Sequence, residues 1–241
     1  MEILATVLFI VIVLIVSYLI GSIPTSILIS KHYGIDIRKY GSHNAGGTNV
    51  GRVIGKKAGI LTIVLDIFKC FIPCLITALV SIYAGIPVVS YSHMTELLVC
   101  LSAFAVAIGH TFPIFASFKG GKAVACFAGF ILFISPIIFV IGISLFFIIY
   151  KLFHRVSLSS IIAVPSIILL AMVPMILDLT VLSDPSTYNG GMYFAPSFFI
   201  HLSYITFIFV FLLAALVVIR HMSNIKRLEK GEEPETHFKK D

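Results

Sequence analysis

Small polar residues and glycines gather in one short stretch of this chain, YGSHNAGGTNVGR, from Tyr40 to Arg52. Its four glycines let the backbone curl so that successive N–H groups point into one concavity, which suits an anion. The guanidinium of Arg52 adds a planar fork that matches the oxygens of a phosphate group. A plain linker is the alternative, but it needs neither the glycines nor the arginine. The stretch therefore predicts a phosphate-binding loop.

A second stretch, GHTFPIFASFKGGKAVA from Gly109 to Ala125, repeats this arrangement. Gly120, Gly121 and Lys122 precede an expected helix, whose N-terminal amides and dipole favour an anion, and Lys122 would add a positive charge. His110 lies late in an apolar segment, where an ionisable residue is costly and usually faces protein or water. It is therefore either a functional group or a hydrogen-bonded structural histidine.

Three further polar features lie in or beside apolar segments. Asp66 and Lys69 are three residues apart, so they can neutralise each other on one helix face, most simply as a pair that fixes helix packing. Ser157 and Ser160 stand at the entrance of a later helix, where Ser157 could be an N-cap. A final polar segment, 221–233, could by itself be an anchor for lipid headgroups. Together these stretches supply many donors and few free carboxylates, which indicates a substrate that carries phosphate.

The elements that must position these residues are membrane helices. Of the 241 residues, 59% are hydrophobic and only 12% are charged, and the mean hydropathy is +1.09. Soluble domains are about one-quarter charged, so this composition excludes that class. The first apolar segment lacks a basic start and a small-residue cleavage site and is expected to be a retained helix. The four cysteines lack metal-ligand spacing and are expected to be packing residues.

Apolar segments long enough to cross a bilayer recur along the chain. A crossing needs about 20 helical residues. The candidate spans are 3–29, 58–83, 96–116, 157–177 and 199–220. The segment 123–150 is interrupted by Ser135-Pro136, so it is either one long kinked helix or a hairpin of a short and a longer helix.

The positive charges decide between these alternatives. With two passes over 123–150, the basic loops and the basic C-terminal segment all lie on one face. With one pass, the C-terminal segment falls on the opposite face, against the positive-inside rule. The two-pass alternative predicts an all-α polytopic membrane protein with about seven transmembrane helices. The N-terminus lies outside and the C-terminus lies in the cytoplasm.

At this point the polar stretches match a known pattern. The chain resembles the bacterial membrane glycerol-3-phosphate acyltransferases that use acyl phosphate as donor, from about residue 15 to residue 233. The first family motif, S-x-N-x-G-A-T-N-x-x-R, matches at Ser42, Asn44, Gly46, Thr48, Asn49 and Arg52. The second, G-H-x-x-P-x-F-x-x-F-x-G-G-K-G-V-A-T, matches at Gly109, His110, Pro113, Phe115, Phe118, Gly120, Gly121 and Lys122. The third, H-x-x-N-I-x-R-L-x-x-G-x-E, matches at His221, Asn224, Ile225, Arg227, Leu228 and Gly231, with Glu232 assigned to its glutamate.

Three positions depart from the family pattern. Gly47 stands where the family has Ala, and Ala123 stands where it has Gly. Both keep a small residue, so close backbone approach is expected to survive. Cys126 replaces a Thr and loses a hydroxyl, so a phosphate contact is not expected there.

The resemblance implies one membrane-embedded acyltransferase domain over residues 1–241. Its cytoplasmic motif loops would be 31–57, 117–122, 151–157 and 221–233, and its outer loop 178–198. The reaction would move a fatty acyl group from acyl phosphate to the 1-hydroxyl of glycerol 3-phosphate. Lysophosphatidic acid and inorganic phosphate would be released in the first step of phospholipid synthesis. The expected setting is a bacterial plasma membrane, with the active site facing the cytoplasm and no metal, coenzyme, nucleic acid or obligate protein partner.

The resemblance also assigns residues to roles. Ser42, His110, Lys122 and Arg52 are the candidate catalytic residues, with Ser42 and His110 orienting the hydroxyl or the leaving group. The candidate phosphate-binding residues are Asn44, Gly46, Gly47, Thr48, Asn49, Gly120, Gly121, Ser157, Ser160, His221 and Asn224. The general base is left open between His110 and a substrate phosphate. A covalent acyl-serine at Ser42 is less favoured because no base is visibly paired with it.

Other chemistries fit less well. The His-x4-Asp motif of the acyl-CoA-dependent superfamily is absent, since His32 and Asp36 come nearest and are four residues apart. A transporter for an organic phosphate is the alternative from another class. Transporters usually bind near the membrane midplane, whereas these charges cluster at one face.

Overall fold

The computed structural model describes residues 2–83, 93–180 and 203–239, and every regular element in these ranges is helical. The α-helices are α1 (Glu2–Gly21), α2 (Thr25–His32), α3 (Gly47–Val53), α4 (Lys56–Tyr83), α5 (Met94–Thr111), α6 (Val124–Ile134), α7 (Pro136–Phe153), α8 (Val156–Thr180), α9 (Tyr204–Arg220) and α10 (Met222–Glu229). Two short 3₁₀ helices, η1 (Ile37–Lys39) and η3 (Ile114–Ala116), lie in the polar loops. The predicted outer loop 178–198 lies outside the described residues from 181 onward.

The helices identify a multi-pass membrane protein. In the described ranges, five helical segments are long and apolar enough to cross a bilayer. The pair α9 and α10, which is bent by 56°, makes a sixth if it is counted as one span. The shorter α6 is apolar as well, so the expectation of about seven helices stays a prediction. On α1, side chains such as Ile3 and Leu4 are 80% and 73% exposed, as expected for a surface that faces lipid.

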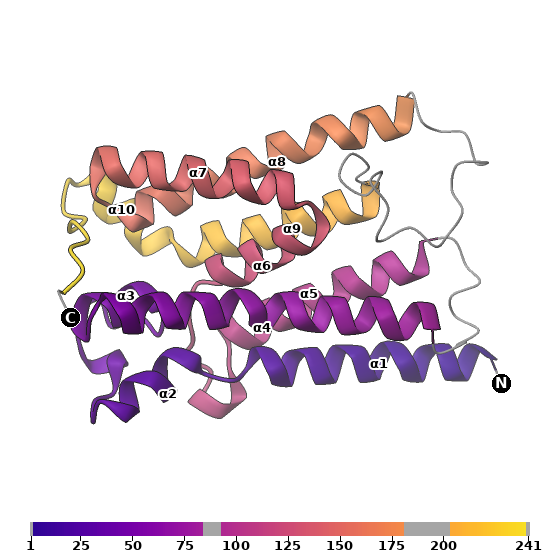
Figure 1. Ribbon diagram of the computed structural model, residues 1–241, viewed down its shortest axis with the longest axis horizontal. Helices are drawn as coiled ribbons and strands as arrows, with labels where there is room; N and C mark the ends of the chain where they lie inside the picture. The colour runs from indigo at the N-terminus through magenta and orange to yellow at the C-terminus, as the bar shows by residue number, and fades with distance from the viewer. Residues whose placement is uncertain (1, 84–92, 181–202, 240–241) are drawn as a thin grey trace.

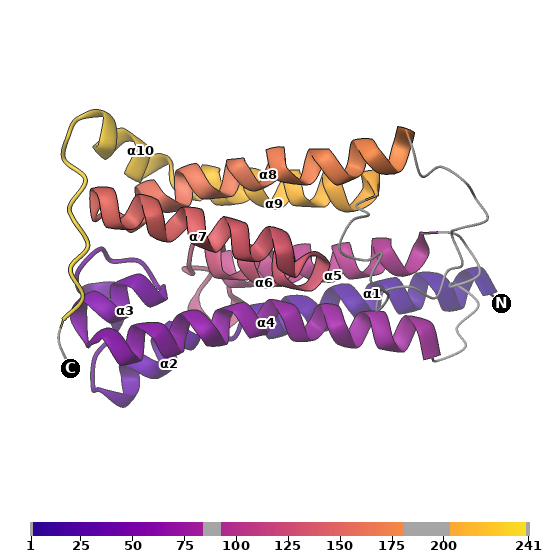
Figure 2. The same ribbon diagram turned by 45° about the horizontal axis from the view of Figure 1, so that its top comes forward.

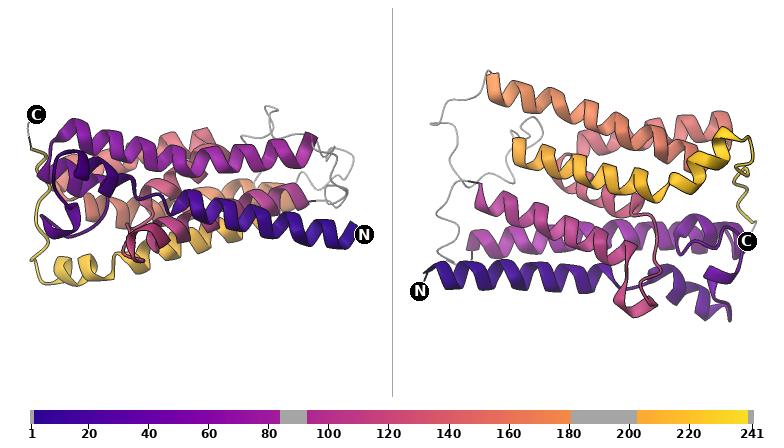
Figure 3. Two further views of the ribbon diagram at one scale, coloured as in Figure 1. Left: turned by 90° about the horizontal axis from the view of Figure 1, so that it is seen from below. Right: turned by 180° about the vertical axis from the view of Figure 1, so that it is seen from behind.

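The long helices run side by side along one axis, and the polar elements gather at one end of it (Figures 1 and 2). The beginning of α1 lies at one end of the bundle. The elements α2, α3 and α10 lie at the other end, where the chain terminates (Figure 1). The bend between α9 and α10 is visible at this end from behind (Figure 3). The elements of the first and third polar stretches therefore share this end of the bundle, and the side of the membrane that it faces stays a prediction.

The short helix α6 supplies the centre of the core. Phe127, Phe130 and Ile131 are at most 1% exposed and pack among residues of α4, α5, α8 and α9. The predicted hairpin is confirmed, since α6 ends at Ile134, α7 begins at Pro136, and the two helices run in opposite directions (Figure 1). Proline fits the first turn of a helix because its missing N–H is not needed there, and Ser135 caps α7 by accepting from Ile138 N. All four cysteines are buried and free, as expected of packing residues.

The predicted spans 3–29 and 96–116 correspond to the candidate spans Ile3–His32 and Met94–Ala116, but the α-helix inside each is interrupted. In the first, α1 ends at Gly21 and α2 begins only at Thr25. Pro24 has no N–H to continue the helix. Gly21 also packs against the backbone of α5, where a Cβ built on it would lie 2.2 Å from the carbonyl oxygen of Val106. The span predicted over 96–116 ends as an α-helix at Thr111 and continues into η3.

Candidate phosphate-binding site

A chain of hydrogen bonds joins residues of three distant segments. Lys122 Nζ donates to Oδ1 of Asn224 at 2.5 Å, and Asn224 Nδ2 donates to Oε1 of Glu233 at 2.7 Å. Ser157 Oγ donates to the same glutamate oxygen at 2.5 Å. Arg227 Nε donates to the other oxygen, Oε2, at 2.7 Å. The structure therefore brings together Lys122, Ser157 and Asn224 of the predicted site.

The bend between α9 and α10 places Asn224. His221 stands at this bend, and its Nδ1 contacts the carbonyl oxygen of Val217 at 2.7 Å, which ties the ring to the end of α9. Asn224 then falls in the first turn of α10 and is only 5% exposed. Ser157 lies in the first turn of α8, which begins at Val156. Ser157 is therefore not the N-cap of that helix, and its hydroxyl is directed to Glu233 instead.

Arg52 reaches the same region from α3. Its Nη2 donates to Oγ1 of Thr236 at 3.0 Å, while its Nε is buried and has no hydrogen-bond partner among the described residues. Burial lowers the pKa of Arg52 below its ordinary value, although the charge of Glu233 opposes this. A guanidinium with a buried and unpaired N–H suits an anionic ligand.

Several positive charges act on Lys122. Burial lowers the pKa of Lys122 to about 8. The carboxylate of Glu233 opposes this shift, whereas Arg227, Arg220 and Arg52 add to it. Burial also raises the pKa of Glu233, but hydrogen bonds from its neighbours outweigh that effect and the pKa lies below its ordinary value. Three cations, Lys122, Arg52 and Arg227, thus interact with one carboxylate, and Arg220 acts on Lys122 as well, an arrangement that favours further negative charge.

The first polar loop is organised around Asn49. This side chain is 1% exposed, and its Oδ1 accepts from Ser42 N at 2.9 Å. Its Nδ2 faces the carbonyl oxygens of Tyr40, Asn44 and Ile37 at 2.9, 3.1 and 3.2 Å. Asn49 therefore holds the loop from inside, and its side-chain groups are already occupied. Ser42 is exposed on the outside of the loop.

The same loop begins the helix that carries Arg52. Gly46 stands at the N-cap of α3, and Gly47 and Thr48 form its first turn, where backbone amides lack helical partners. A Cβ built on Gly47 would lie 2.5 Å from Ile63 Cγ1 and 2.9 Å from the carbonyl oxygen of Gly59. The glycine at this position is therefore matched to close packing of α3 on α4.

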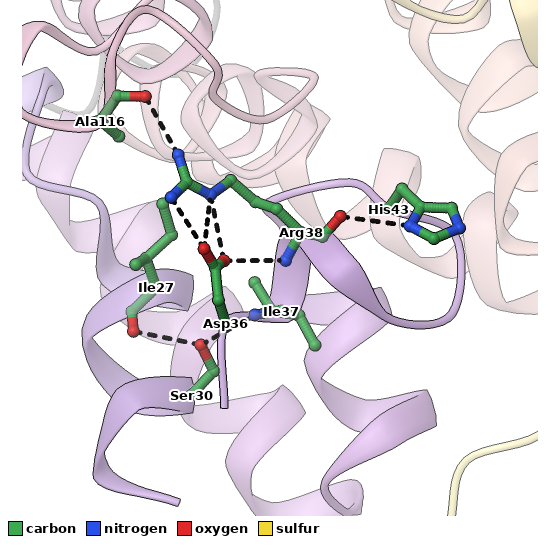
Figure 4. A network of polar contacts seen from close by, with 7 residues as sticks. All are labelled: Ile27, Ser30, Asp36, Ile37, Arg38, His43 and Ala116. Atoms are coloured by element: carbon green, nitrogen blue, oxygen red, sulfur yellow. Dashed lines mark hydrogen bonds and ion pairs between the residues drawn. The ribbon is translucent and has the colours of Figure 1, made fainter. Parts of the chain in front are cut away.

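A second network ties this loop to the turn that precedes Gly120 (Figure 4). Arg38 donates through Nε and Nη2 to Asp36 and through Nη1 to the carbonyl oxygen of Ala116, the latter at 3.2 Å. Hydrogen bonding from Arg38 lowers the pKa of Asp36 to about 2. His43 Nδ1 contacts the carbonyl oxygen of Arg38 at 3.2 Å. The first and second polar stretches are thus held together by side-chain contacts.

Comparison with known proteins identifies the family of this chain. The model of the family described as glycerol-3-phosphate acyltransferase matches residues 11–231. The chain belongs to this family. Curated glycerol-3-phosphate acyltransferases of Staphylococcus aureus strains Newman and bovine RF122 / ET3-1 are 36% and 37% identical to it over 226 residues. These alignments cover 93% of this chain and 96% of each relative.

Two solved structures of a family member have the same fold. They are crystal structures of PlsY (YgiH), an integral membrane glycerol 3-phosphate acyltransferase, in glycerol 3-phosphate and lysophosphatidic acid forms. Both are 30% identical to this chain, with TM-scores of 0.72 and 0.70. The first alignment covers 95% of this chain and 96% of that one, and the second covers 94% of each.

The family motifs explain which residues the sequence analysis missed. Glu233 and Thr236 were not among its candidates, yet both contact candidate residues. Counted from Gly231, the G-x-E spacing of the third motif ends at residue 233. The assignment of that glutamate to Glu232 is therefore wrong, and correct spacing would have identified Glu233. Thr236 follows the motif and carries no such signal.

The remaining candidates lie deeper in the bundle. Ser160 is 2% exposed and donates to the carbonyl oxygen of Val156 within α8. Cys126, which departs from the family pattern, is fully buried in the core. His110 contacts Lys69 at 3.0 Å, and the predicted pair of Asp66 with Lys69 is confirmed at 2.9 Å.

Proposed function

We propose that this chain transfers a fatty acyl group from acyl phosphate to the 1-hydroxyl of sn-glycerol 3-phosphate. The products are 1-acyl-sn-glycerol 3-phosphate and inorganic phosphate. The enzyme acts in the plasma membrane of a bacterium, and the face that carries α2, α3 and α10 is the cytoplasmic one. Family membership supports the acyl acceptor, and the donor is our inference.

The cluster around Lys122 is the observation that carries this proposal. Its ammonium is largely buried and adjoins Asn224, and the charges of Arg52, Arg220 and Arg227 act on it. Both substrates carry phosphate, so the site must hold two anions close together. Cations that converge on a buried position neutralise that repulsion and bring the hydroxyl to the carbonyl.

The reaction needs little beyond this positioning. The hydroxyl oxygen of glycerol 3-phosphate attacks the carbonyl carbon of the acyl phosphate and forms the ester bond. The bond from that carbon to the phosphate oxygen breaks, and its electron pair leaves with phosphate. An acyl phosphate is a mixed anhydride, so its carbonyl is already activated. Lys122 and Arg52 stabilise the charge on the departing phosphate.

A phosphate oxygen is our proposed acceptor for the hydroxyl proton. The carboxylate of the cluster, Glu233, already accepts hydrogen bonds from Ser157, Asn224 and Arg227. Those bonds lower its pKa and weaken it as a base. Ser42 then orients the acceptor hydroxyl from the first loop, with no covalent acyl-serine.

The test uses the purified protein in detergent or lipid mesophase with palmitoyl phosphate and glycerol 3-phosphate. Phosphate release and lysophosphatidate formation are followed together, with palmitoyl-CoA as the alternative donor. We expect turnover with palmitoyl phosphate only, and its loss in Lys122→Ala. Lys119→Ala is the matched control, because Lys119 is exposed and lies three residues earlier. Equal turnover with palmitoyl-CoA contradicts the proposed donor, and folded protein without turnover in either case favours a transporter, tested by phosphate flux into liposomes.

A further inference from the structure

A buried network of polar side chains lies beside the candidate site, and the reaction above uses none of them. Asp66 Oδ1 accepts from Lys69 Nζ at 2.9 Å and from Thr25 Oγ1 at 2.5 Å. Lys69 Nζ also contacts His110 Nδ1 at 3.0 Å and donates to the carbonyl oxygen of Ile23 at 3.1 Å. Asp66 is 2% exposed, and Lys69 and His110 are each 8% exposed. Ionised groups at this depth are costly unless their partners are held in place.

Lys69 orients the ring of His110. An ammonium group only donates, so Nδ1 of His110 must accept, and the ring proton then resides on Nε2. That nitrogen faces the glycine turn, because a Cβ built on Gly121 would lie 2.2 Å from it. Nδ1 is therefore occupied and Nε2 is a donor. The imidazole packs against the turn, and neither of its nitrogens is available to accept the proton of a substrate hydroxyl.

The glycine turn is held tightly between the end of α5 and the first loop. Gly121 N donates to the carbonyl oxygen of His110 at 3.0 Å. A Cβ on Gly120 would lie 2.1 Å from that same oxygen, and a Cβ on Gly121 would lie 3.1 Å from the carbonyl oxygen of Ala45. Lys122 is the next residue along the chain. The position of its ammonium therefore depends on a turn that rests on the ring of His110.

We propose that Asp66 and Lys69 are positioning residues for Lys122, acting through His110 and the Gly120–Gly121 turn. The inference rests on the proposed role of Lys122 in phosphate binding. Without Lys69, the ring loses its orienting donor and the turn loses a fixed surface. The ammonium of Lys122 is then no longer held in line with the other cations. A misplacement of about 1 Å is enough to weaken such a site severely.

The test replaces the pair by neutral side chains of similar size, Asp66→Asn together with Lys69→Met. Removing both charges of a buried pair is often neutral for stability, whereas removing one leaves an uncompensated charge. The Kd of inorganic phosphate is measured by titration calorimetry, beside the Tm in the same detergent and the KM for glycerol 3-phosphate. We expect a Tm close to that of the unsubstituted protein, with Kd and KM at least about tenfold higher, equivalent to about 1.4 kcal/mol of binding.

The matched control removes another buried polar contact between helices. Ser17 and Ser102 join α1 to α5 through hydroxyls 2.8 Å apart, and neither is among the residues nearest a Cβ built on Gly120 or Gly121. Ser17→Ala with Ser102→Ala should leave both Kd and KM unchanged. An Asp66→Asn/Lys69→Met protein that binds phosphate as tightly as the unsubstituted protein would overturn the proposal, because the pair would then serve stability alone.

A second pair of variants tests the role of the His110 ring if the protein with Asp66→Asn and Lys69→Met does not fold. Gly121→Ala forces a methyl group into the ring of His110, and Gly121→Ala with His110→Ala removes the ring that it meets. We expect the double variant to bind phosphate at least about threefold more tightly than Gly121→Ala, roughly 0.6 kcal/mol of binding, but less tightly than the unsubstituted protein, because the clash is relieved while the supporting ring is lost. If the double variant binds phosphate no more tightly than Gly121→Ala, the proposed role of the His110 ring in positioning the turn is wrong. Unchanged phosphate affinity in Lys122→Met instead refutes the phosphate site itself, and this inference with it.

Discussion

Lys122 and Asn224 are 102 residues apart in the chain, yet Nζ of the lysine lies 2.5 Å from Oδ1 of the asparagine. The contact joins the glycine turn before α6 to the bend between α9 and α10. Lysine can donate three hydrogen bonds, so two remain for a ligand after this one. The asparagine therefore aims the ammonium without neutralising it.

An aspartate in place of Asn224 should neutralise the ammonium of Lys122 and so weaken phosphate binding. Asn224→Asp puts a negative charge against Lys122 and beside Glu233, where it repels phosphate and pairs with the ammonium. We expect kcat/KM to fall by at least about a hundredfold, which corresponds to about 2.7 kcal/mol. Ser223→Asp is the control, because it adds the same charge on the exposed side of α10. Equal losses in the two variants would indicate a general charge effect.

Phosphate binding should weaken as the pH rises through about 8. Burial lowers the pKa of Lys122 to about 8, so the ammonium predominates below that pH and the neutral amine above it. The KM for glycerol 3-phosphate, measured from about pH 6.5 to about pH 9.5, should rise toward tenfold per pH unit on the alkaline side. In Lys122→Arg the charge persists throughout this range, and the alkaline rise should disappear. A KM that is independent of pH in the unsubstituted protein would contradict this assignment.

Glu233 should be needed for the C-terminal segment to stay in place. Its carboxylate accepts from Ser157, Asn224 and Arg227, so Glu233→Gln weakens three contacts at once. We expect a loss of about 1–3 kcal/mol of stability, seen as a Tm lower by several degrees. Glu232→Gln is the neighbouring control, because Glu232 is exposed and should leave the Tm unchanged.

The same carboxylate predicts how stability depends on pH. The pKa of Glu233 is below its ordinary value in the folded protein. Its stabilising effect is therefore complete above the ordinary glutamate pKa and is lost as the pH falls through the folded-state pKa. The difference in Tm between Glu233→Gln and the unsubstituted protein should shrink in acid, and a constant difference would contradict this account.

The protein should become more stable when Ala123 is replaced by glycine. This alanine has a φ of 60°, a left-handed conformation that an alanine adopts only at a cost of about 1 kcal/mol. Ala123→Gly should therefore raise the Tm by a few degrees in a thermal unfolding scan. Ala128→Gly, inside α6, should lower it, because glycine weakens a helix interior by about 1 kcal/mol.

The sequence by itself determined the helical membrane fold and part of the candidate phosphate-binding site. Hydropathy locates long apolar helices because each crossing must satisfy its own backbone within the bilayer. The break at Ser135-Pro136 was predictable for a local reason, since proline cannot continue a helix and serine can cap the next, whereas the distribution of basic residues along the chain decided for the hairpin. The motif spacing identified Lys122 and Asn224, and the position at a helix entrance identified Ser157, and the structure brings these three together. These features depend on short segments that can be interpreted without their neighbours.

Only the tertiary structure decided which polar side chains form their hydrogen bonds within the protein. The break between α1 and α2 leaves the carbonyl oxygen of Ile23 to a donor from α4, namely Lys69, 46 residues away. Asn49 and His110 looked like site residues in the sequence, yet their polar atoms contact the protein itself. A buried polar atom takes whichever partner the packed helices bring within about 3 Å. That partner is set by how the helices cross, and no spacing along the chain encodes it.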